Sequence, residues 1–236
     1  MPRSALWKSI AETLTAEIAS GHYRPGDKLP TELQLSARFG VNRHTVRHAL
    51  SALAATGTVH SRRGAGVFVA LVPTDYPLGR RVRFHQNVLA SGRTPSRQIL
   101  RIETRPSDAR EAEMLALAVG EAVHVVEGLS LADGVPLAKF RSTFPALRFP
   151  DLPAAMARVS SVTQALAEGG LADYTRASTR LTAKAADAIM ALHLRVAEGS
   201  PVLRTVALNV DAAGKPVEFG ITWFAGDRVT LTVFPD

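Results

Sequence analysis

Cysteine is absent from this chain of 236 residues, which excludes disulfides and cysteine-ligated metal sites. No run of about 18 apolar residues occurs, so no membrane-spanning helix is expected. The N-terminal sequence MPRSALWKS lacks the apolar core of a secretory signal peptide. Together these absences predict a protein of the reducing cytoplasm that does not engage a membrane.

Familiar catalytic and cofactor signatures are missing as well. There is no HExxH pair, and the Gly64-Ala65-Gly66 turn precedes a strand pattern, so it is not a dinucleotide-binding or P-loop fingerprint. The seven histidines are scattered along the chain. His44 and His48 have the spacing of helical metal ligands, but a DNA-facing role for His44 fits their helix better. The sequence therefore predicts no catalytic residue, no metal site and no cofactor.

Positive charge is present, and it is concentrated in the N-terminal third. The formal net charge is +7, of which residues 1–72 carry +5 and the remainder +2. This distribution is typical of a small DNA-binding unit beside a nearly balanced globular domain. A solvated basic surface with no nucleic-acid partner would give the same charge pattern.

Residues 31–50 have the pattern of a helix-turn-helix. Thr31 and Asn42 are helix-capping residues, and Gly40 marks the end of the first helix between them. Apolar residues follow at Leu33, Leu35 and Phe39 in the first helix, and at Val46, Leu50 and Leu53 in the second. A further helix is expected over residues 5–20, and a β-hairpin over 58–69.

The first turn of the second helix is polar and cationic. A helix of this size fits the DNA major groove, where arginine can bind guanine through two parallel hydrogen bonds. The hairpin tip adds arginines and glycines, which suit a close approach to the DNA backbone or minor groove. The candidate DNA-binding residues are Thr31, Asn42, Arg43, His44, Thr45, Arg47, Arg62, Arg63 and Gly64. The alternative is a helical subdomain with a solvated basic face.

The chain beyond residue 72 has the pattern of a second domain. Two prolines in a segment without periodicity predict a linker over 73–79, between a domain at 1–72 and another at 80–236. Strands are expected at 96–105, 123–131, 137–144, 174–182, 202–210, 215–222 and 229–234, with helices between them, and the last strand is expected to close the sheet. This order predicts an α+β domain on an antiparallel sheet.

Arginine is enriched at the start of this second domain. Eight arginines and no lysine lie between residues 80 and 110, opposed only by Glu103 and Asp108. The planar guanidinium binds phosphate-like anions. A small acidic ligand is therefore plausible, and the alternative is again a solvated face.

Both halves of the chain resemble parts of one protein family. The runs YRPGDKLPTE, LSARFGVNRHTVRHAL and SRRGAGVFV resemble the winged helix-turn-helix of the GntR family of bacterial repressors, over about residues 3–71. In that family, residues matching Arg43, His44, Thr45, Arg47, Arg63 and Gly64 face the operator, and Leu33 stands where a phosphate-contacting arginine is common. The chain from about residue 80 resembles the UTRA ligand-sensing domain, of chorismate-lyase-like fold, which defines the HutC branch. The resemblance implies a homodimeric, effector-responsive repressor that binds a palindromic operator.

Several residues are similar to those of HutC-type regulators of phosphonate metabolism: Asp75-Tyr76-Pro77-Leu78, Arg83-Phe84, Asn87, Gly92 and Pro95. The resemblance implies control of phosphonate uptake or breakdown, or of a related pathway, by a phosphonate- or phosphate-containing effector. Sugar-phosphate-sensing relatives often carry arginine on the strand before the first hairpin turn, whereas that strand here reads Glu127-Gly128-Leu129-Ser130-Leu131 and contains none.

The candidate effector-binding residues are Arg83, Phe84, His85, Arg141, Glu218, Thr222, Trp223 and Arg228. Among them, Glu218 is expected either to orient an arginine or to bind an amine or hydroxyl of the ligand. Three alternatives stay open for the whole protein: a HutC-type regulator of another pathway, a chorismate-lyase-like enzyme with an attached DNA-binding head, and a nonspecific DNA-binding protein.

Overall fold

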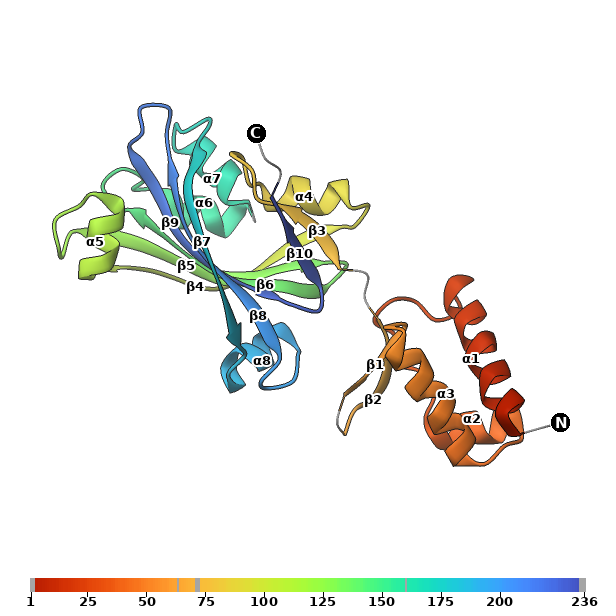
Figure 1. Cartoon of the computed structure of the whole chain (residues 1–236). Helices are drawn as coiled ribbons and strands as arrows, with labels where there is room; N and C mark the ends of the chain where they lie inside the picture. Colours follow the sequence, from red (N-terminus) through yellow and green to blue (C-terminus); the bar gives the residue numbers. More distant parts are fainter. Residues whose placement is uncertain (1–2, 63, 71–72, 160, 234–236) are drawn as a thin grey trace. The chain divides into compact units, whose positions relative to one another are not determined.

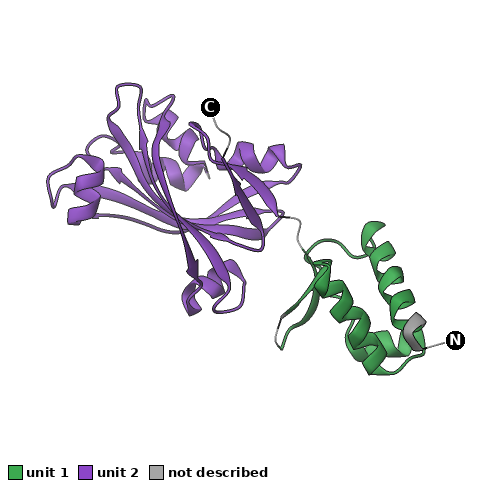
Figure 2. Cartoon of the chain, viewed as in Figure 1, with its two compact units in different colours: residues 1–72 green, residues 73–236 purple. Residues whose placement is uncertain are grey.

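The computed structural model describes residues 3–62, 64–70, 73–159 and 161–233. The chain divides into two compact units, residues 1–72 and 73–236 (Figure 2). Each unit has its own hydrophobic core. None of the helices in the described ranges is long and apolar enough to cross a membrane.

The first unit consists of three helices followed by a hairpin (Figure 1). Its elements are α1 (Arg3–Ala19), α2 (Glu32–Phe39), α3 (Arg43–Ala55), β1 (Val59–Arg62) and β2 (Gly66–Val69). Leu14, Leu35 and Val46, one from each helix, are fully buried in a common core that also takes Val59 and Val69 from the hairpin. The predicted winged helix-turn-helix is confirmed, and the shared core fixes the hairpin against the helices.

The second unit is built on a six-stranded antiparallel sheet with the order β4-β5-β6-β9-β8-β7 (Figure 1). Its strands are β4 (Pro95–Pro106), β5 (Ala122–Ala132), β6 (Val135–Pro145), β7 (Thr175–Ala185), β8 (Pro201–Val210) and β9 (Pro216–Ala225). Its helices are α4 (Phe84–Ala90), α5 (Ala109–Leu115), α6 (Leu152–Arg158), α7 (Val162–Glu168) and α8 (Ala188–Leu194). The predicted α+β class is confirmed.

Helices cover both faces of this sheet. On one face, Phe140 and Phe144 of β6 pack in a core with residues of α6 and α7, and Phe224 of β9 packs with Phe84 of α4. On the other face, Leu115 of α5 packs against β5, β8 and β9, and residues of α8 cover the neighbouring end. Because side chains alternate along a strand, the face of each strand residue follows from these contacts.

The two halves of the second unit repeat one motif, β4-α5-β5-β6 and β7-α8-β8-β9. Asp108 and Asp187 cap the two helices by accepting hydrogen bonds from the backbone N–H three residues on, at 2.8 and 2.7 Å. Each helix ends at a residue in the left-handed region, Ala116 and Arg195, both at φ 53°. The corresponding sequences, DAREAEMLALAVG and DAIMALHLRVAEG, share their small and capping positions. The central strands β6 and β9 are therefore equivalent elements of the two halves.

The segment expected to be a linker is instead a strand. β3 (Thr74–Pro77) pairs in parallel with β10 (Val229–Thr232), and Thr74 and Tyr76 are buried. This pair forms its own two-stranded sheet, so residues 229–232 do not close the six-stranded sheet as expected. The partners lie about 150 residues apart in the chain, and prolines confined to edges and ends are compatible with a strand. Nothing local in the sequence reveals such a pairing.

Candidate DNA-binding surface and ligand cavity

The first turn of α3 is fixed by its N-terminal cap. The Asn42 Oδ1 atom accepts hydrogen bonds from the backbone N–H and from the hydroxyl of Thr45, each at 2.9 Å. From this turn and the next, Arg43, His44 and Arg47 are exposed to solvent. The cap thus presents a cationic group of side chains at a helix N-terminus, as major-groove recognition requires.

The two helices of the motif are joined by an ion pair. Arg47 donates from Nε and Nη2 to the two carboxylate oxygens of Glu32, at 3.0 and 2.8 Å. The hydrogen bonds from Arg47 lower the pKa of Glu32. In the protein without DNA, these two hydrogen bonds turn the Arg47 guanidinium toward Glu32.

The start of α2 is capped as expected, with one difference in the core. Thr31 Oγ1 accepts from the Gln34 N–H at 3.3 Å, and the Gln34 side chain accepts from the Thr31 N–H at 2.8 Å. This reciprocal capping box occupies the Thr31 side chain. Leu33, an expected apolar position, is 57% exposed on the first turn of α2.

The hairpin turn contains glycine where the backbone requires it. Gly64 and Gly66 have φ values of 74° and 115°, and a Cβ at residue 66 would lie 2.8 Å from the Lys28 side chain. Arg62 ends β1, but its side chain and the whole of Arg63 lie outside the described residues, so their expected DNA contacts stay predictions.

His48, which has the helical spacing of a metal ligand with His44, is engaged in packing. The His48 ring stacks on Trp7, with ring centroids 4.4 Å apart, and is used in packing. Among the described residues, no group of three or more histidine, aspartate or glutamate side chains is arranged to hold a metal ion.

The second unit contains a cavity of about 330 Å³ on the sheet face that carries α4 and α7. Its floor is made by small side chains of the central strands, Ala138, Ser142, Ala207 and Gly220. Small residues on adjacent strands leave space beneath the covering helices, because no side chain fills it. The cavity is therefore encoded in the strand sequences.

Arg97 of β4 lines this cavity with its donors free. Its guanidinium carbon lies 5.5 Å from the ring centroid of Phe84 and 4.8 Å from that of Phe140. The Nε and Nη1 atoms are buried and have no hydrogen-bond partner among the described residues. Burial lowers the pKa of Arg97, although arginine remains charged at neutral pH. A buried guanidinium with unused donors is suited to an oxyanion.

A chain of hydrogen bonds crosses the other part of the cavity. Glu218 accepts from the Ser142 hydroxyl at 2.5 Å and from the Asn209 amide at 2.7 Å. The Asn209 carbonyl oxygen accepts from Arg176 Nε at 2.7 Å, and Arg176 also donates to the Thr179 hydroxyl at 3.1 Å. Burial lowers the pKa of Arg176, which the charge of Glu218 opposes. The carboxylate and the arginine are thus held in fixed places by one amide.

The remaining charged group of the wall is already paired. Arg83 donates to the Tyr174 carbonyl at 2.8 Å and to the Asp173 carboxylate at 3.2 Å, with its guanidinium 3.8 Å from the Tyr174 ring centroid. His85 beside it has a lowered pKa, caused by burial and by the charge of Arg97. Of these two arginines, Arg97 rather than Arg83 therefore has buried donors without a partner among the described residues.

The structure brings together five of the eight expected effector residues. Arg83, Phe84, His85, Glu218 and Thr222 line the cavity, whereas Arg141, Trp223 and Arg228 do not. Strand alternation explains two of the exceptions, because Arg141 and Trp223 lie between cavity-facing neighbours and point to the opposite sheet face.

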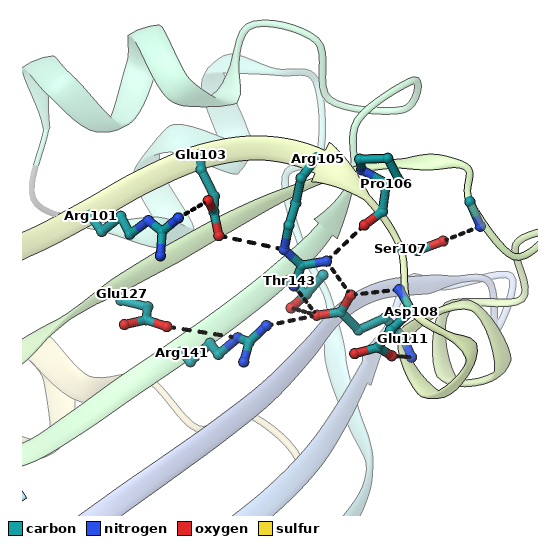
Figure 3. Close-up of polar contacts among 11 residues, drawn as sticks. Arg101, Glu103, Arg105, Pro106, Ser107, Asp108, Glu111, Glu127, Arg141 and Thr143 are labelled. Atoms are coloured by element: carbon teal, nitrogen blue, oxygen red, sulfur yellow. Dashed lines mark hydrogen bonds and ion pairs between the residues drawn. The ribbon is translucent and has the colours of Figure 1, made fainter.

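Arg141 belongs to a polar cluster on that opposite face (Figure 3). Glu111 of α5, only 3% exposed, accepts from two nitrogens of Arg105 at 2.7 and 2.6 Å and from Arg141 at 3.1 Å. The Glu127 carboxylate lies 3.9 Å from Arg141 Nε. The expectation that Arg141 serves the effector pocket is therefore wrong in position, and its contacts fasten α5 to the sheet.

Arg228 is also structural. Its side chain is 1% exposed and donates to the carbonyl oxygens of Pro136, Leu194 and Arg195, at 2.7, 2.6 and 2.8 Å. It thereby binds the C-terminal end of α8 to the start of β6, away from the cavity.

Neither Arg97 nor Arg176 was among the residues predicted from the sequence. Arg97 lies within the arginine-rich stretch, but the alternation of β4 does not by itself show which face is covered. Arg176 stands beside Asn209 only through the pairing of β7 with β8. The small residues of β6, β8 and β9 were the feature of the sequence that could have indicated a cavity. They indicate it only when the pairing of these strands is known.

A winged helix-turn-helix with an exposed cationic recognition helix, joined to a domain with a basic cavity, defines a ligand-binding transcriptional regulator. Comparison with known families agrees: residues 6–69 match the bacterial regulatory proteins of the gntR family, and residues 90–230 match the UTRA domain. The chain belongs to the GntR family, and its UTRA domain makes it a regulator of HutC type.

Relatives match this chain over nearly its whole length. It is 37% identical to an HTH-type transcriptional regulator of Rhizobium meliloti (strain 1021), covering 97% of this chain and 94% of the relative. It is 35% identical to the "Probable transcriptional regulator PhnF" of Escherichia coli (strain K12), covering 96% and 94%. The crystal structure of PhnF from Mycobacterium smegmatis superposes with a TM-score of 0.69 at 26% identity, covering 96% and 99%.

Proposed function

We propose that this protein is a homodimeric repressor of phosphonate uptake or breakdown genes, and that a small oxyanion in its cavity changes its affinity for DNA. The observation that carries the proposal is Arg97, whose buried Nε and Nη1 atoms are unpaired among the described residues of a GntR-family regulator. A phosphonate or phosphate group supplies oxygen acceptors that match one edge of a guanidinium. The similarity to PhnF supports the pathway.

The DNA-binding part of the proposal rests on the first turns of α3. Arg43, His44 and Arg47 are exposed there, and Arg47 keeps Nη1 beyond the two nitrogens that it donates to Glu32, so each residue can offer a donor to base edges. In a dimer, two recognition helices about 34 Å apart read an inverted repeat. The wing residues Arg62, Arg63 and Gly64 are proposed to contact the DNA backbone or minor groove.

The effector part rests on where the cavity begins along the chain. Tyr76 of β3 and Phe84 of α4 both line it, and β3 starts at Thr74, two residues after the first unit ends. A ligand that contacts these elements acts on the segment that directly continues from the DNA-binding unit. Such a ligand shifts DNA binding only if it binds the DNA-competent and incompetent states with different affinities.

We further propose that the cavity binds its ligand without converting it, as the regulator relatives support. The test is fluorescence anisotropy of the full chain with DNA from upstream of its own gene and of neighbouring phosphonate genes. Random DNA is the control, the salt concentration is fixed, and phosphate and phosphonates are added in turn. Specific binding that one compound weakens supports the proposal. Equal binding to random DNA contradicts it.

A further inference from the structure

We infer that the effector is a small zwitterion, in which Arg97 binds a phosphonate- or phosphate-type oxyanion and Glu218 binds an ammonium group. This inference rests on the proposed function, because it takes the cavity as the effector site. It adds the charge pattern of the ligand, which neither the family nor the relatives specify.

The charges of the cavity wall match such a ligand. Arg97 and Arg176 each contribute one positive charge and Glu218 one negative charge, whereas Arg83 belongs to an ion-pair cluster in which it shares Asp173 with Arg81. Apart from that cluster, the wall carries one net positive charge. A phosphate-type group has a charge of about −1.5 to −2 at neutral pH, and an ammonium group reduces the total of the ligand to about −0.5 to −1. The bound pair is therefore close to neutral, which lowers the cost of burying its charges.

The oxyanion end is defined by Arg97. Its guanidinium carbon lies over the rings of Phe84 and Phe140, and its Nε and Nη1 atoms are buried without a partner among the residues described. Nε and Nη1 lie on different edges of the guanidinium, each of which is completed by Nη2, and either edge can bind two oxygens of one oxyanion. The rings also form an apolar wall for a short carbon chain.

The ammonium end is defined by Glu218. Each of its carboxylate oxygens accepts one hydrogen bond, from Ser142 and from Asn209, and a carboxylate has about four acceptor sites in all. The next residue on the same strand face is Gly220, where a Cβ would lie 3.5 Å from Glu218 Oε1. Because that position has no side chain, cavity space adjoins the carboxylate. A ligand ammonium placed there donates to Glu218 directly.

The competing explanation is that Glu218 only positions Arg176, through the bridging Asn209. In that case the charge of Glu218 is balanced within the protein, and an amine on the ligand does not increase its affinity. The two explanations make opposite predictions for ligands that have the same size and oxyanion but differ in the amine.

The experiment is calorimetric titration of the full chain with 2-aminoethylphosphonate and with propylphosphonate, which has nearly the same shape but no charge at the far end. We expect the amino compound to bind at least tenfold more tightly. In Glu218→Gln, which keeps the side-chain shape, we expect this preference to fall below threefold. Arg141→Ala, on the opposite sheet face, is the matched control and keeps the preference. We expect Arg97→Met to weaken the binding of both compounds, because both carry the oxyanion.

Equal affinity of the two compounds for the unaltered protein, no binding of either, or a preference that survives Glu218→Gln overturns the inference. The same ligands are then added to the protein–operator complex. A preference for the amine without any change in DNA binding leaves the inference standing and contradicts the effector role. If a phosphonate without an amine shifts DNA binding as strongly as the amino compound does, the effector role stands and the inference is contradicted.

Discussion

Arg47 of the recognition helix and Glu32 of the preceding helix hold each other through two parallel hydrogen bonds of 3.0 and 2.8 Å. Both side chains lie on the surface, where an isolated ion pair contributes little to stability. The geometry is still informative, because a forked pair fixes the plane of the guanidinium. This orientation sets which donors of Arg47 remain for DNA.

Replacing Arg47 with alanine is expected to weaken binding to the operator by about tenfold or more, as for an arginine that reads a base. Glu32→Gln, which removes the charge that orients the fork, is expected to weaken it in the same direction but less. Anisotropy titrations on operator and random DNA at one salt concentration measure both. Equal losses on the two DNAs would make Arg47 a phosphate contact instead.

The cluster around Glu111 predicts a loss of stability without a loss of ligand binding. Glu111→Ala leaves Arg105 and Arg141 without their shared acceptor, and the breaking of a buried ion pair is strongly destabilising. Because both arginines are partly exposed, we expect a smaller loss, about 2–3 kcal/mol, in the unfolding free energy of the second unit. Denaturant unfolding measures it. A fall in ligand affinity without a change in stability would instead indicate that this cluster contributes to the effector site.

Local patterns in the sequence predicted most of the elements. Thr31 and Asn42 were identified as caps, and each accepts the expected backbone hydrogen bond. The strands expected at 123–131 and 137–144 are joined by Asp133-Gly134, a turn dipeptide whose residues have positive φ, at 50° and 74°. These features depend on a few neighbouring residues, which is why the sequence alone sufficed.

What escaped prediction depends on contacts between distant segments. β3 was interpreted as a linker because its partner β10 lies at the far end of the chain. Arg141 was expected in the pocket, but the pairing of β6 puts it on the opposite face. Arg97 enters the cavity only because α4, which carries Phe84, covers that end of the sheet. The cavity is thus a property of strand register.

His124 predicts a pH dependence of stability. Its side chain is buried, and its Nδ1 atom lies 2.7 Å from the Thr104 hydroxyl. Burial lowers the pKa of His124, against a smaller opposing effect from the Phe149 backbone. As the pH falls below about 6.5, the unfolded chain takes up the proton first, so the folded state loses stability. We expect the melting temperature to fall between pH 7 and 5, and His124→Gln to flatten this slope. An equal slope in the variant would contradict the assignment.

Arg228 offers the sharpest test of a structural role against a ligand role. Its guanidinium donates to three backbone carbonyl oxygens, those of Pro136, Leu194 and Arg195, and its side chain is 1% exposed. Arg228→Met keeps most of the apolar stem but leaves those carbonyls short of a charged donor, each such bond contributing about 1.5–3 kcal/mol. We therefore expect a loss of about 3–5 kcal/mol in the unfolding free energy of the second unit, since the effects overlap. Arg180→Met, at an exposed position of the edge strand β7, is the control and should stay within about 0.5 kcal/mol of the unaltered protein. A variant at Arg228 that unfolds normally but no longer binds the phosphonates would show that this arginine reaches the ligand after all.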